Sequence, residues 1–170
     1  FVAFSAIPLV ILYPLAKRFT KWPQIILGLT FSWSVPTAWS AANEEWNLGI
    51  FIMYLATVFW IIGYDTIYGC QDKNEDEIFG IKNSAVSAKN FLTLFVGCSY
   101  SLMFCLLIIS GYLLNNNIFW YIGVSICGLH LANQVRKIKN IEQNNPLQIF
   151  KSNIVLGLFL TLSSLGNHIS

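Results

Sequence analysis

Residues 48–70, LGIFIMYLATVFWIIGYDTIYGC, decide the fold class of this chain. They contain an uninterrupted apolar run from Ile50 to Tyr64, with aliphatic and aromatic side chains on every side. A membrane-spanning helix needs about 20 predominantly apolar residues, whereas a strand would show alternation of apolar and polar residues. The stretch therefore predicts a transmembrane helix.

The overall composition agrees with a membrane protein. The chain has 170 residues, of which 55% are hydrophobic and 11% are charged, against about 25% charged in ordinary soluble domains. Its net charge of +2 is too small to indicate a nucleic-acid partner. We therefore expect an integral membrane protein in contact with lipid and without nucleic acid.

The same search finds further apolar runs along the whole chain. A run such as SLMFCLLIISGYLL (101–114) is apolar on all sides, which disfavours a β-barrel, whose strands alternate. We expect an all-α, multi-pass transmembrane helix bundle that forms a single membrane domain, 1–170. The six predicted spans are 1–16, 22–42, 48–70, 90–114, 117–135 and 150–168.

The positive charges indicate the orientation of these spans. All ten Lys and Arg residues lie in the first, third and fifth connections, 17–21, 71–89 and 136–151. The positive-inside rule places these connections in the cytoplasm or its organellar equivalent. Phe1 then lies on the outer side, so we expect an odd number of preceding helices and a domain that is incomplete at its N-terminus.

The expected location of the protein is a membrane. The chain carries no recognisable targeting segment. We expect a multi-pass protein of a bacterial inner membrane, with a mitochondrial inner membrane as the alternative.

Small residues four apart occur in two of the predicted helices. Gly28 is followed by Ser32, and Gly97 is followed by Ser101. Such pairs let membrane helices approach closely. They support a bundle without indicating a function.

An acidic stretch follows the deciding helix. If residues 65–76 continue that helix, Asp65, Tyr68, Asp72 and Asp76 fall within about 60° of arc. Like charges at this spacing repel one another, and a divalent cation relieves the repulsion. Oxygen ligands favour Mg²⁺ or Ca²⁺, and Mg²⁺ commonly bridges carboxylates to phosphate oxygens. The pattern thus predicts the acidic, metal-binding part of a site for a diphosphate.

Asp65 indicates function more strongly than its acidic neighbours do. An ionisable group at membrane depth costs about 2.5 to 3.5 kcal/mol on insertion scales unless it faces a wet or paired cavity. Glu75 and Glu77, by contrast, are typical of a solvated loop. An anionic ligand also needs cations, which the same membrane side supplies, although they also serve as topology signals and lipid contacts. The candidates are Lys17, Arg18, Lys21, Lys73 and Lys82.

Two stretches together resemble a known family. YPLAKRFTKWPQIILG (13–28) is similar to its YPxxKRxTxxPQ motif, and YDTIYGCQDKNEDEIFGIKNSA (64–85) is similar to its second aspartate-rich motif, DxxYxxxDxxxD. The chain resembles the UbiA-type intramembrane aromatic prenyltransferases, closest to the 4-hydroxybenzoate polyprenyltransferases of ubiquinone biosynthesis. One departure is Asn83–Ser84, where the family more often has Ser–Thr.

The resemblance has consequences for the fold. Members of the family have nine helices and an active site on the cytoplasmic side, which corresponds to the matrix side in mitochondria. Their first aspartate-rich motif, of the NDxxDxxxD type, does not occur in this sequence. We therefore expect six of the nine helices here, as the C-terminal part of such an enzyme, and a fragment that is inactive alone.

The resemblance also implies a reaction. In it, Mg²⁺ bridges the aspartate motifs to a polyprenyl diphosphate, and the ring of 4-hydroxybenzoate is alkylated beside its hydroxyl. The cationic intermediate needs electron-rich walls, for which the helices offer Trp33, Trp39, Phe59, Trp60 and Tyr64. The implied site comprises, as catalytic residues, Asp65, Tyr68, Lys17 and Arg18; as substrate-binding residues, Lys17, Arg18, Lys21, Lys73 and Lys82; and as metal ligands, Asp72, Asp76 and Asp65.

Two other interpretations stay open at this point. A membrane transporter or channel subunit could use Asp65 and its neighbours as an acidic ion site, although the acids cluster at one membrane side. A non-functional remnant of a longer gene also fits a chain that begins with Phe1. Related enzymes alkylate other quinone precursors, so the acceptor rests on the resemblance alone, and the prenyl length and oligomeric state stay open.

Overall fold

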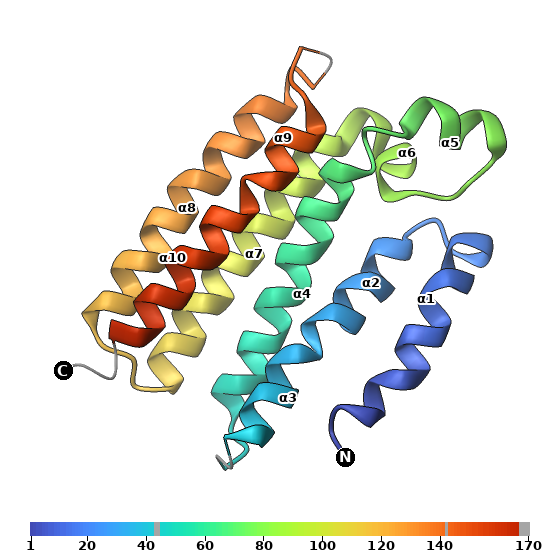
Figure 1. Cartoon of the computed structure of the whole chain (residues 1–170). Coiled ribbons are helices and arrows are strands. Elements are labelled where there is room, and N and C mark those ends of the chain that lie inside the picture. Colours follow the sequence, from blue (N-terminus) through green and yellow to red (C-terminus); the bar gives the residue numbers. More distant parts are fainter. Residues whose placement is uncertain (43–44, 142, 167–170) are drawn as a thin grey trace.

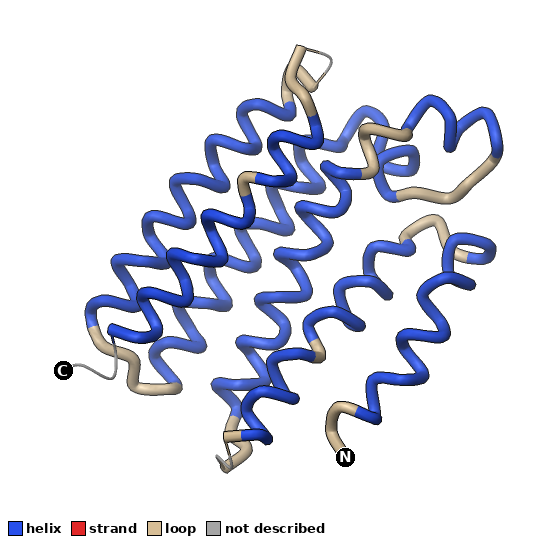
Figure 2. The backbone as a smooth tube through the Cα atoms, viewed as in Figure 1, coloured by secondary structure: helices blue, strands red, loops and turns tan. Residues whose placement is uncertain are grey.

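The computed structural model of the chain describes residues 1–42, 45–141 and 143–166 (Figure 1). Every regular element in these ranges is helical, and the tube in Figure 2 contains no strand within them. The predicted all-α fold is confirmed. In chain order the elements are η1 (Phe4–Ala6), α1 (Ile7–Phe19), α2 (Pro23–Ser32), α3 (Ser34–Ala41), α4 (Leu48–Tyr68), α5 (Lys73–Phe79), α6 (Ser84–Ala88), η2 (Lys89–Phe91), α7 (Leu92–Leu113), α8 (Ile118–Ile138), α9 (Pro146–Lys151) and α10 (Asn153–Gly166).

Within the described ranges, four helical segments are long and apolar enough to cross a membrane. They pack as a bundle in which α4 contacts α7, α7 contacts α8, α8 contacts α10, and α9 returns to α4 (Figure 1). Exposed large apolar side chains cover much of the outside, as expected for helices that face lipid. The four segments are Leu48–Tyr68, Ser84–Leu113, Ile118–Ile138 and Pro146–Gly166.

The second predicted span differs from expectation. Residues 22–42 form two helices, α2 and α3, that meet at Trp33 instead of one continuous span. Pro36 explains the break, because proline has no N–H to donate to the carbonyl of Ser32 and its ring clashes with that carbonyl. The first span is also short, since its apolar helix covers Phe4–Ala16.

The remaining helices extend the bundle on one side. α2 packs on α4, and α1 packs on α2 as the outermost helix (Figure 1). The α1–α2 turn, the α5–α6 segment and the α8–α9 connection all lie at the same end of the bundle. These are the three connections that carry every Lys and Arg. The predicted gathering of positive charge at one membrane face is therefore present.

Close contact between α4 and α7 depends on Gly63. A Cβ atom added at Gly63 would lie 2.3 Å from Cε1 of Tyr100, so only glycine leaves room for that ring. Tyr100 cannot easily move, because it is 3% exposed and its hydroxyl donates to Oε1 of Gln134 at 2.7 Å. Gly63 thus sets the distance between the two central helices.

Gly63→Ala should destabilise the bundle by about 1 to 3 kcal/mol, because an added methyl group overpacks this contact. Thermal unfolding in detergent measures the loss. Gly157→Ala in α10 is the matched control, since its added Cβ would lie at an ordinary 3.6 Å from Trp60. Equal unfolding midpoints for the two variants would contradict this account of the α4–α7 contact.

A buried polar network joins the break between α9 and α10 to the bundle. Gln134 donates from Nε2 to Oγ of Ser152 at 2.9 Å, and its Nε2 lies 3.1 Å from Nε2 of His130. Asn153 accepts a hydrogen bond from Nε1 of Trp60 at 2.9 Å. Polar pairs of this kind fix the rotation of membrane helices, so the network sets how α9 meets α4.

Candidate active site

The acidic stretch lies on two separate helices. α4 ends at Tyr68 with Gly69 as its C-terminal cap, and α5 begins at Lys73. The prediction of one continuous helix over 65–76 is wrong. Where the helix ends, Nδ2 of Asn83 donates to the carbonyl of Gly69 at 3.0 Å, which would otherwise accept from the N–H of Lys73 in a continuing helix. A Cβ atom at residue 69 would lie 2.5 Å from Oδ1 of Asn83, so glycine leaves room for this side chain.

Asp72 and Asp76 are presented by the short helix α5. Asp72 occupies its N-cap position without forming a side-chain capping bond, and it is exposed. Asp76 is half-buried. α5 stops at Gly80, whose φ of +67° requires the left-handed conformation that glycine adopts most easily. The two carboxylates therefore lie one turn apart at the end of the bundle.

Asn83 anchors this acidic helix. Its Nδ2 donates to Oδ2 of Asp76 at 2.8 Å and to the carbonyl of Gly69 at 3.0 Å. Its Oδ1 accepts from the N–H of Ala85 at 2.9 Å, which caps α6. Asn83 is 6% exposed. One side chain thus ties the end of α4, the acid of α5 and the start of α6 together.

Gln24 connects this anchor to α2. Its Nε2 donates to Oδ1 of Asn83 at 3.2 Å, and its Oε1 accepts from the N–H of Ser84 at 3.0 Å and from the Ser84 hydroxyl. Gln24 is 5% exposed. Sequence reasoning noted Gln24 in a motif without giving it a role. The sequence feature that could have indicated its role is a polar side chain near the start of an apolar run.

The basic first connection lies against the third connection. Lys82 donates from Nζ to the carbonyl of Arg18 at 3.1 Å, and Ser87 donates from its hydroxyl to the carbonyl of Lys21 at 2.8 Å. Arg18 and Lys21 are themselves exposed. The two motif-bearing connections, 59 to 66 residues apart along the chain, are thus held side by side.

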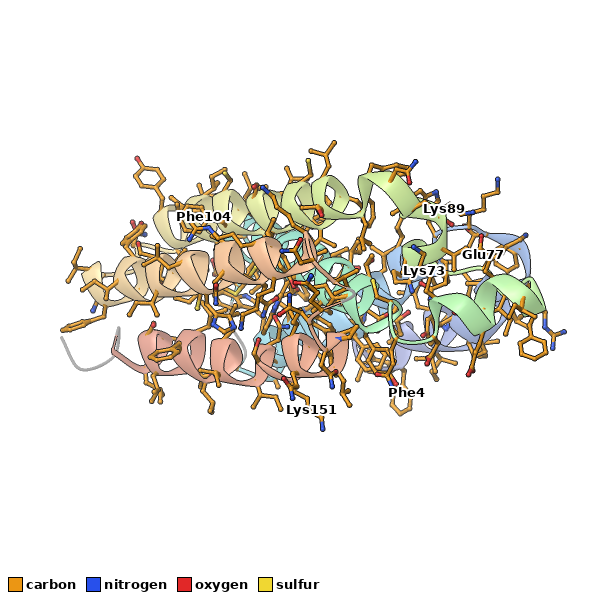
Figure 3. The ribbon with its side chains drawn as sticks, turned by 90° about the horizontal axis from the view of Figure 1, so that it is seen from above. Phe4, Lys73, Glu77, Lys89, Phe104 and Lys151 are labelled. Carbon is orange, nitrogen blue, oxygen red and sulfur yellow. The ribbon has the colours of Figure 1, made fainter. Side chains whose placement is uncertain are left out.

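Lys73 and Lys17 are the other predicted cations of the site. Lys73 is half-buried in the first turn of α5. Lys17 belongs to α1, but its side chain lies outside the described residues. Figure 3 shows Lys73 near Glu77 and Lys89 at the α5–α6 end. Cations and acids are therefore interspersed at this end.

Glu77 forms an exposed ion pair outside the site. Nζ of Lys89 donates to its Oε1 at 2.6 Å. The hydrogen bond and the positive charge of Lys89 hold the pKa of the Glu77 carboxyl below its usual range. Exposed pairs contribute little to stability, which agrees with the predicted solvated role of Glu77.

Asp65 lies one turn before the end of α4 and is half-buried. Its carboxylate acts electrostatically on the phenols of Tyr13, from α1, and Tyr64. Tyr13 belongs to the first sequence motif. The charge of Asp65 is therefore felt by a residue of the other motif.

Aromatic side chains line the same end of α4. Phe150 of α9 packs against Tyr64, with ring centroids 5.5 Å apart, and against Tyr68, at 4.9 Å. Trp60 meets Tyr64 edge-on at 5.8 Å. Trp33 lies elsewhere, because its Nε1 donates to the carbonyl of Val2 at 2.9 Å near the N-terminus. Sequence reasoning found Tyr64 and Trp60 but missed Phe150, which no local pattern marks.

The predicted metal ligands do not form a closed cage. Within the described residues, no group of three or more His, Cys, Asp or Glu side chains could hold a metal ion. Mg²⁺, however, is usually bound by one or two carboxylates together with phosphate oxygens and waters. The exposed Asp72 and the anchored Asp76 fit an open site of that kind. Cys70 does not, since burial raises the pKa of its thiol to about 11.

Comparison with known proteins agrees with these features. The UbiA prenyltransferase family matches residues 1–162. A mitochondrial 4-hydroxybenzoate polyprenyltransferase of Dictyostelium discoideum is 37% identical over 166 residues, which cover 93% of this chain and 34% of that protein. A 4-hydroxybenzoate octaprenyltransferase of Francisella tularensis subsp. novicida is 37% identical over 168 residues, which cover 99% of this chain and 59% of that protein.

The chain thus spans between a third and three fifths of the length of these relatives. No solved structure matches it. The family match nevertheless covers almost every residue, including both sequence motifs and the helices that present them. The chain therefore belongs to the UbiA prenyltransferase family.

Proposed function

We propose that the protein transfers a polyprenyl group from polyprenyl diphosphate to the ring of 4-hydroxybenzoate in ubiquinone biosynthesis. The names of its relatives support this substrate pair. The observation that carries the proposal is the link from Asp76 through Asn83 to Gln24. That link brings the acidic and the basic motif to one end of the bundle, as an anionic substrate with a metal requires.

The acidic residues would hold the metal. UbiA prenyltransferases generally depend on a divalent metal ion, and the all-oxygen ligands here favour Mg²⁺. Asp72 and Asp76 are the proposed ligands, with Asp65 either completing the set or orienting it. When bound, Mg²⁺ neutralises charge on the diphosphate and helps it to leave. Asn83 keeps the Asp76 carboxylate in place through its hydrogen bond.

The basic residues would hold the diphosphate. Arg18 and Lys21 are exposed beside the third connection, and Lys82 reaches the carbonyl of Arg18. Lys17 and Lys73 are the further candidates from the motifs. Positive groups aimed at the departing diphosphate stabilise the charge that develops on it. The chain would thereby favour breakage of the bond between carbon and oxygen.

The aromatic residues would accommodate the cationic prenyl group. The candidates are Tyr64 and Tyr68 of α4, which both pack against Phe150 and flank Asp65 in the sequence. Aromatic ring faces attract a cation in a site that excludes water. The ring carbon beside the acceptor hydroxyl then bonds to the carbon of the prenyl cation. The hydrogen on that ring carbon leaves as a proton, which restores the aromatic ring.

We place this site at the cytoplasmic or matrix face of a bacterial or mitochondrial inner membrane. The four apolar spans support a membrane protein, and the clustering of Lys and Arg at one end supports the side. Residues 1–170 would form one membrane domain and would need the family's first aspartate motif, absent from this sequence, for activity.

The test uses membranes from cells that express the complete gene product. Transfer of a labelled polyprenyl group to 4-hydroxybenzoate should occur with Mg²⁺ and stop with EDTA, because the metal is required for the diphosphate to leave. Residues 1–170 expressed alone are the inactive control. If the protein instead conducts ions across the membrane of reconstituted vesicles and transfers no prenyl group, the proposal is wrong. The acidic residues would then form the ion site of a transporter.

A further inference from the structure

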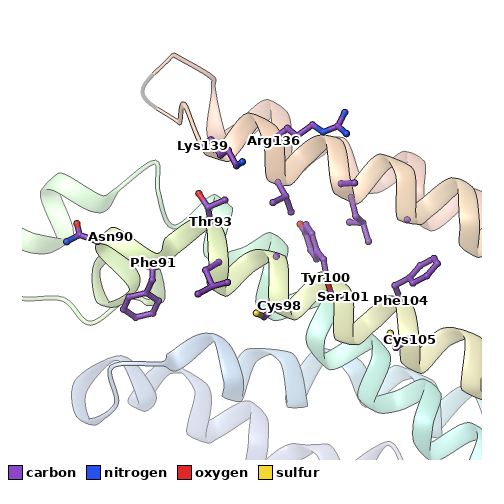
Figure 4. A pocket seen from close by; sticks show the side chains of 16 residues that line it. Asn90, Phe91, Thr93, Cys98, Tyr100, Ser101, Phe104, Cys105, Arg136 and Lys139 are labelled. Carbon is purple, nitrogen blue, oxygen red and sulfur yellow. The ribbon is translucent and has the colours of Figure 1, made fainter.

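A groove runs along the outer face of the bundle between α7 and α8 (Figure 4). Its volume is about 1040 Å³, which is at the upper end of the roughly 300 to 1,000 Å³ of small-molecule sites. Small residues leave it open, since the nearest atom to a Cβ added at Gly97 would be Cγ1 of Val135 at 3.7 Å. The predicted pair of Gly97 and Ser101 lines this groove where α7 packs on α8.

The groove has an apolar body and a polar end. Its walls include Phe104 and Leu131, and Tyr100 contributes to its lining. At one end, Lys139, the residue that caps α8, lies across from Thr93, and Arg136 lies one turn earlier with its side chain along α8 (Figure 4). This is the end of the bundle that carries the basic connections.

The charge in the groove is of one sign. Arg136 and Lys139 are both exposed, and neither forms an ion pair within the described residues. The described lining contains no Asp or Glu. Two exposed cations attract an anionic headgroup at a membrane surface, and the apolar body suits hydrocarbon. A metal-bound diphosphate is disfavoured, because no carboxylate is present to hold its metal.

The length of the groove also fits a lipid. From Asn90 to Cys105 the lining follows α7 and the turn before it over about 15 residues, or about 22 Å at helical rise. One leaflet with its headgroup region is about 20 to 22 Å thick, half of the roughly 40 to 45 Å of a whole bilayer. Arg136 and Lys139 line one end of this length, as cations that bind a headgroup would.

We propose that the α7–α8 groove binds an anionic phospholipid, with its phosphate at Arg136 and Lys139 and an acyl chain along Gly97. The lining includes neither Asp72 nor Asp76, so the site is separate from the proposed metal site and independent of the transfer reaction. It gives the enzyme a preference for membranes that contain anionic lipid.

The test is native mass spectrometry of the complete gene product in detergent, with phosphatidylglycerol and phosphatidylcholine as probes. The wild type should retain phosphatidylglycerol more tightly than phosphatidylcholine. Arg136→Gln combined with Lys139→Gln should weaken phosphatidylglycerol binding about 30-fold, since the two cations together contribute about 2 kcal/mol near a membrane surface. Gly97→Leu should weaken both lipids, because the added side chain fills the groove.

Lys137→Gln combined with Lys151→Gln is the matched control. It removes the same charge, but neither residue lines the groove, so lipid retention should match the wild type. If this control loses phosphatidylglycerol as readily as the Arg136→Gln, Lys139→Gln variant, net charge alone explains the effect and the proposal is overturned. Displacement of phosphatidylglycerol by equimolar polyprenyl diphosphate would also overturn it, by assigning the groove to the substrate.

Discussion

Asp72→Asn and Asp76→Asn should each lower Mg²⁺-dependent prenyl transfer by at least about 100-fold. An amide keeps the size of the side chain but removes the negative charge that attracts the metal. Asp76→Asn also places a neutral amide against Nδ2 of Asn83, where the carboxylate now accepts a hydrogen bond at 2.8 Å. Initial rates in membranes at saturating polyprenyl diphosphate measure the effect.

The dependence on Mg²⁺ concentration separates a metal ligand from a structural residue. Loss of a ligand should shift the half-maximal Mg²⁺ concentration upward as well as lower the rate. Glu75→Gln is the matched control, because Glu75 is exposed on the same helix and should leave both values within about twofold. Wild-type rates in both aspartate variants would make α5 a solvated segment and remove the basis of the proposed mechanism.

The sequence predicted the long helices because lipid leaves a strong signal. The expected span 90–114 corresponds to α7 at Leu92–Leu113, and 48–70 corresponds to α4 at Leu48–Tyr68. In a bilayer every backbone N–H and C=O must form a hydrogen bond within the protein. An apolar run of that length therefore forms a helix. Composition alone was sufficient for these elements.

The sequence also contained signals that a search for apolar runs passes over. Pro36 divides the second span, although the residues around it are apolar enough for one helix. Asn145 and Pro146 begin α9 with a side-chain cap and a proline in its first turn, ahead of the predicted 150–168. Helix boundaries therefore depended on individual residues rather than on average hydropathy.

The candidate site was predictable in its residue types but not in its connections. Asp65, Tyr68, Asp72 and Asp76 were found by spacing, yet the continuous helix assumed for them is interrupted at Gly69. Asn83, whose side chain donates to the carbonyl at that end, lies 14 residues further on. No period in the sequence marks a contact of this kind, because it depends on how the third connection folds back on α4.

Gln24→Leu should lower prenyl transfer by about 10- to 100-fold, although Gln24 touches neither substrate nor metal in the proposed mechanism. Leucine has a similar size but leaves the N–H of Ser84 without its acceptor and Oδ1 of Asn83 without one of its donors. A buried polar group that loses its partner costs about 1 to 3 kcal/mol. The segment that presents Asp76 should then lose its fixed position.

A merely structural role would lower the amount of folded protein without changing its metal requirement. The decisive measurement is therefore the half-maximal Mg²⁺ concentration of the folded fraction, which should rise in Gln24→Leu, because groups that orient metal ligands typically change metal affinity by 10- to 100-fold. Asn83→Ser should show at least as large a rise, since serine can still cap α6 but lacks the Nδ2 group that donates to Asp76.

The double variant tests whether Gln24 acts through Asn83. If Gln24 holds Asp76 only by way of Asn83, the combined effect of Gln24→Leu and Asn83→Ser should be smaller than the sum of the two single effects, as is usual for residues of one hydrogen-bond network. Fully additive effects would show that Gln24 acts through its bonds to Ser84 alone. An unchanged Mg²⁺ requirement in all three variants would leave Gln24 as a packing residue and would separate the α2 helix from the metal site.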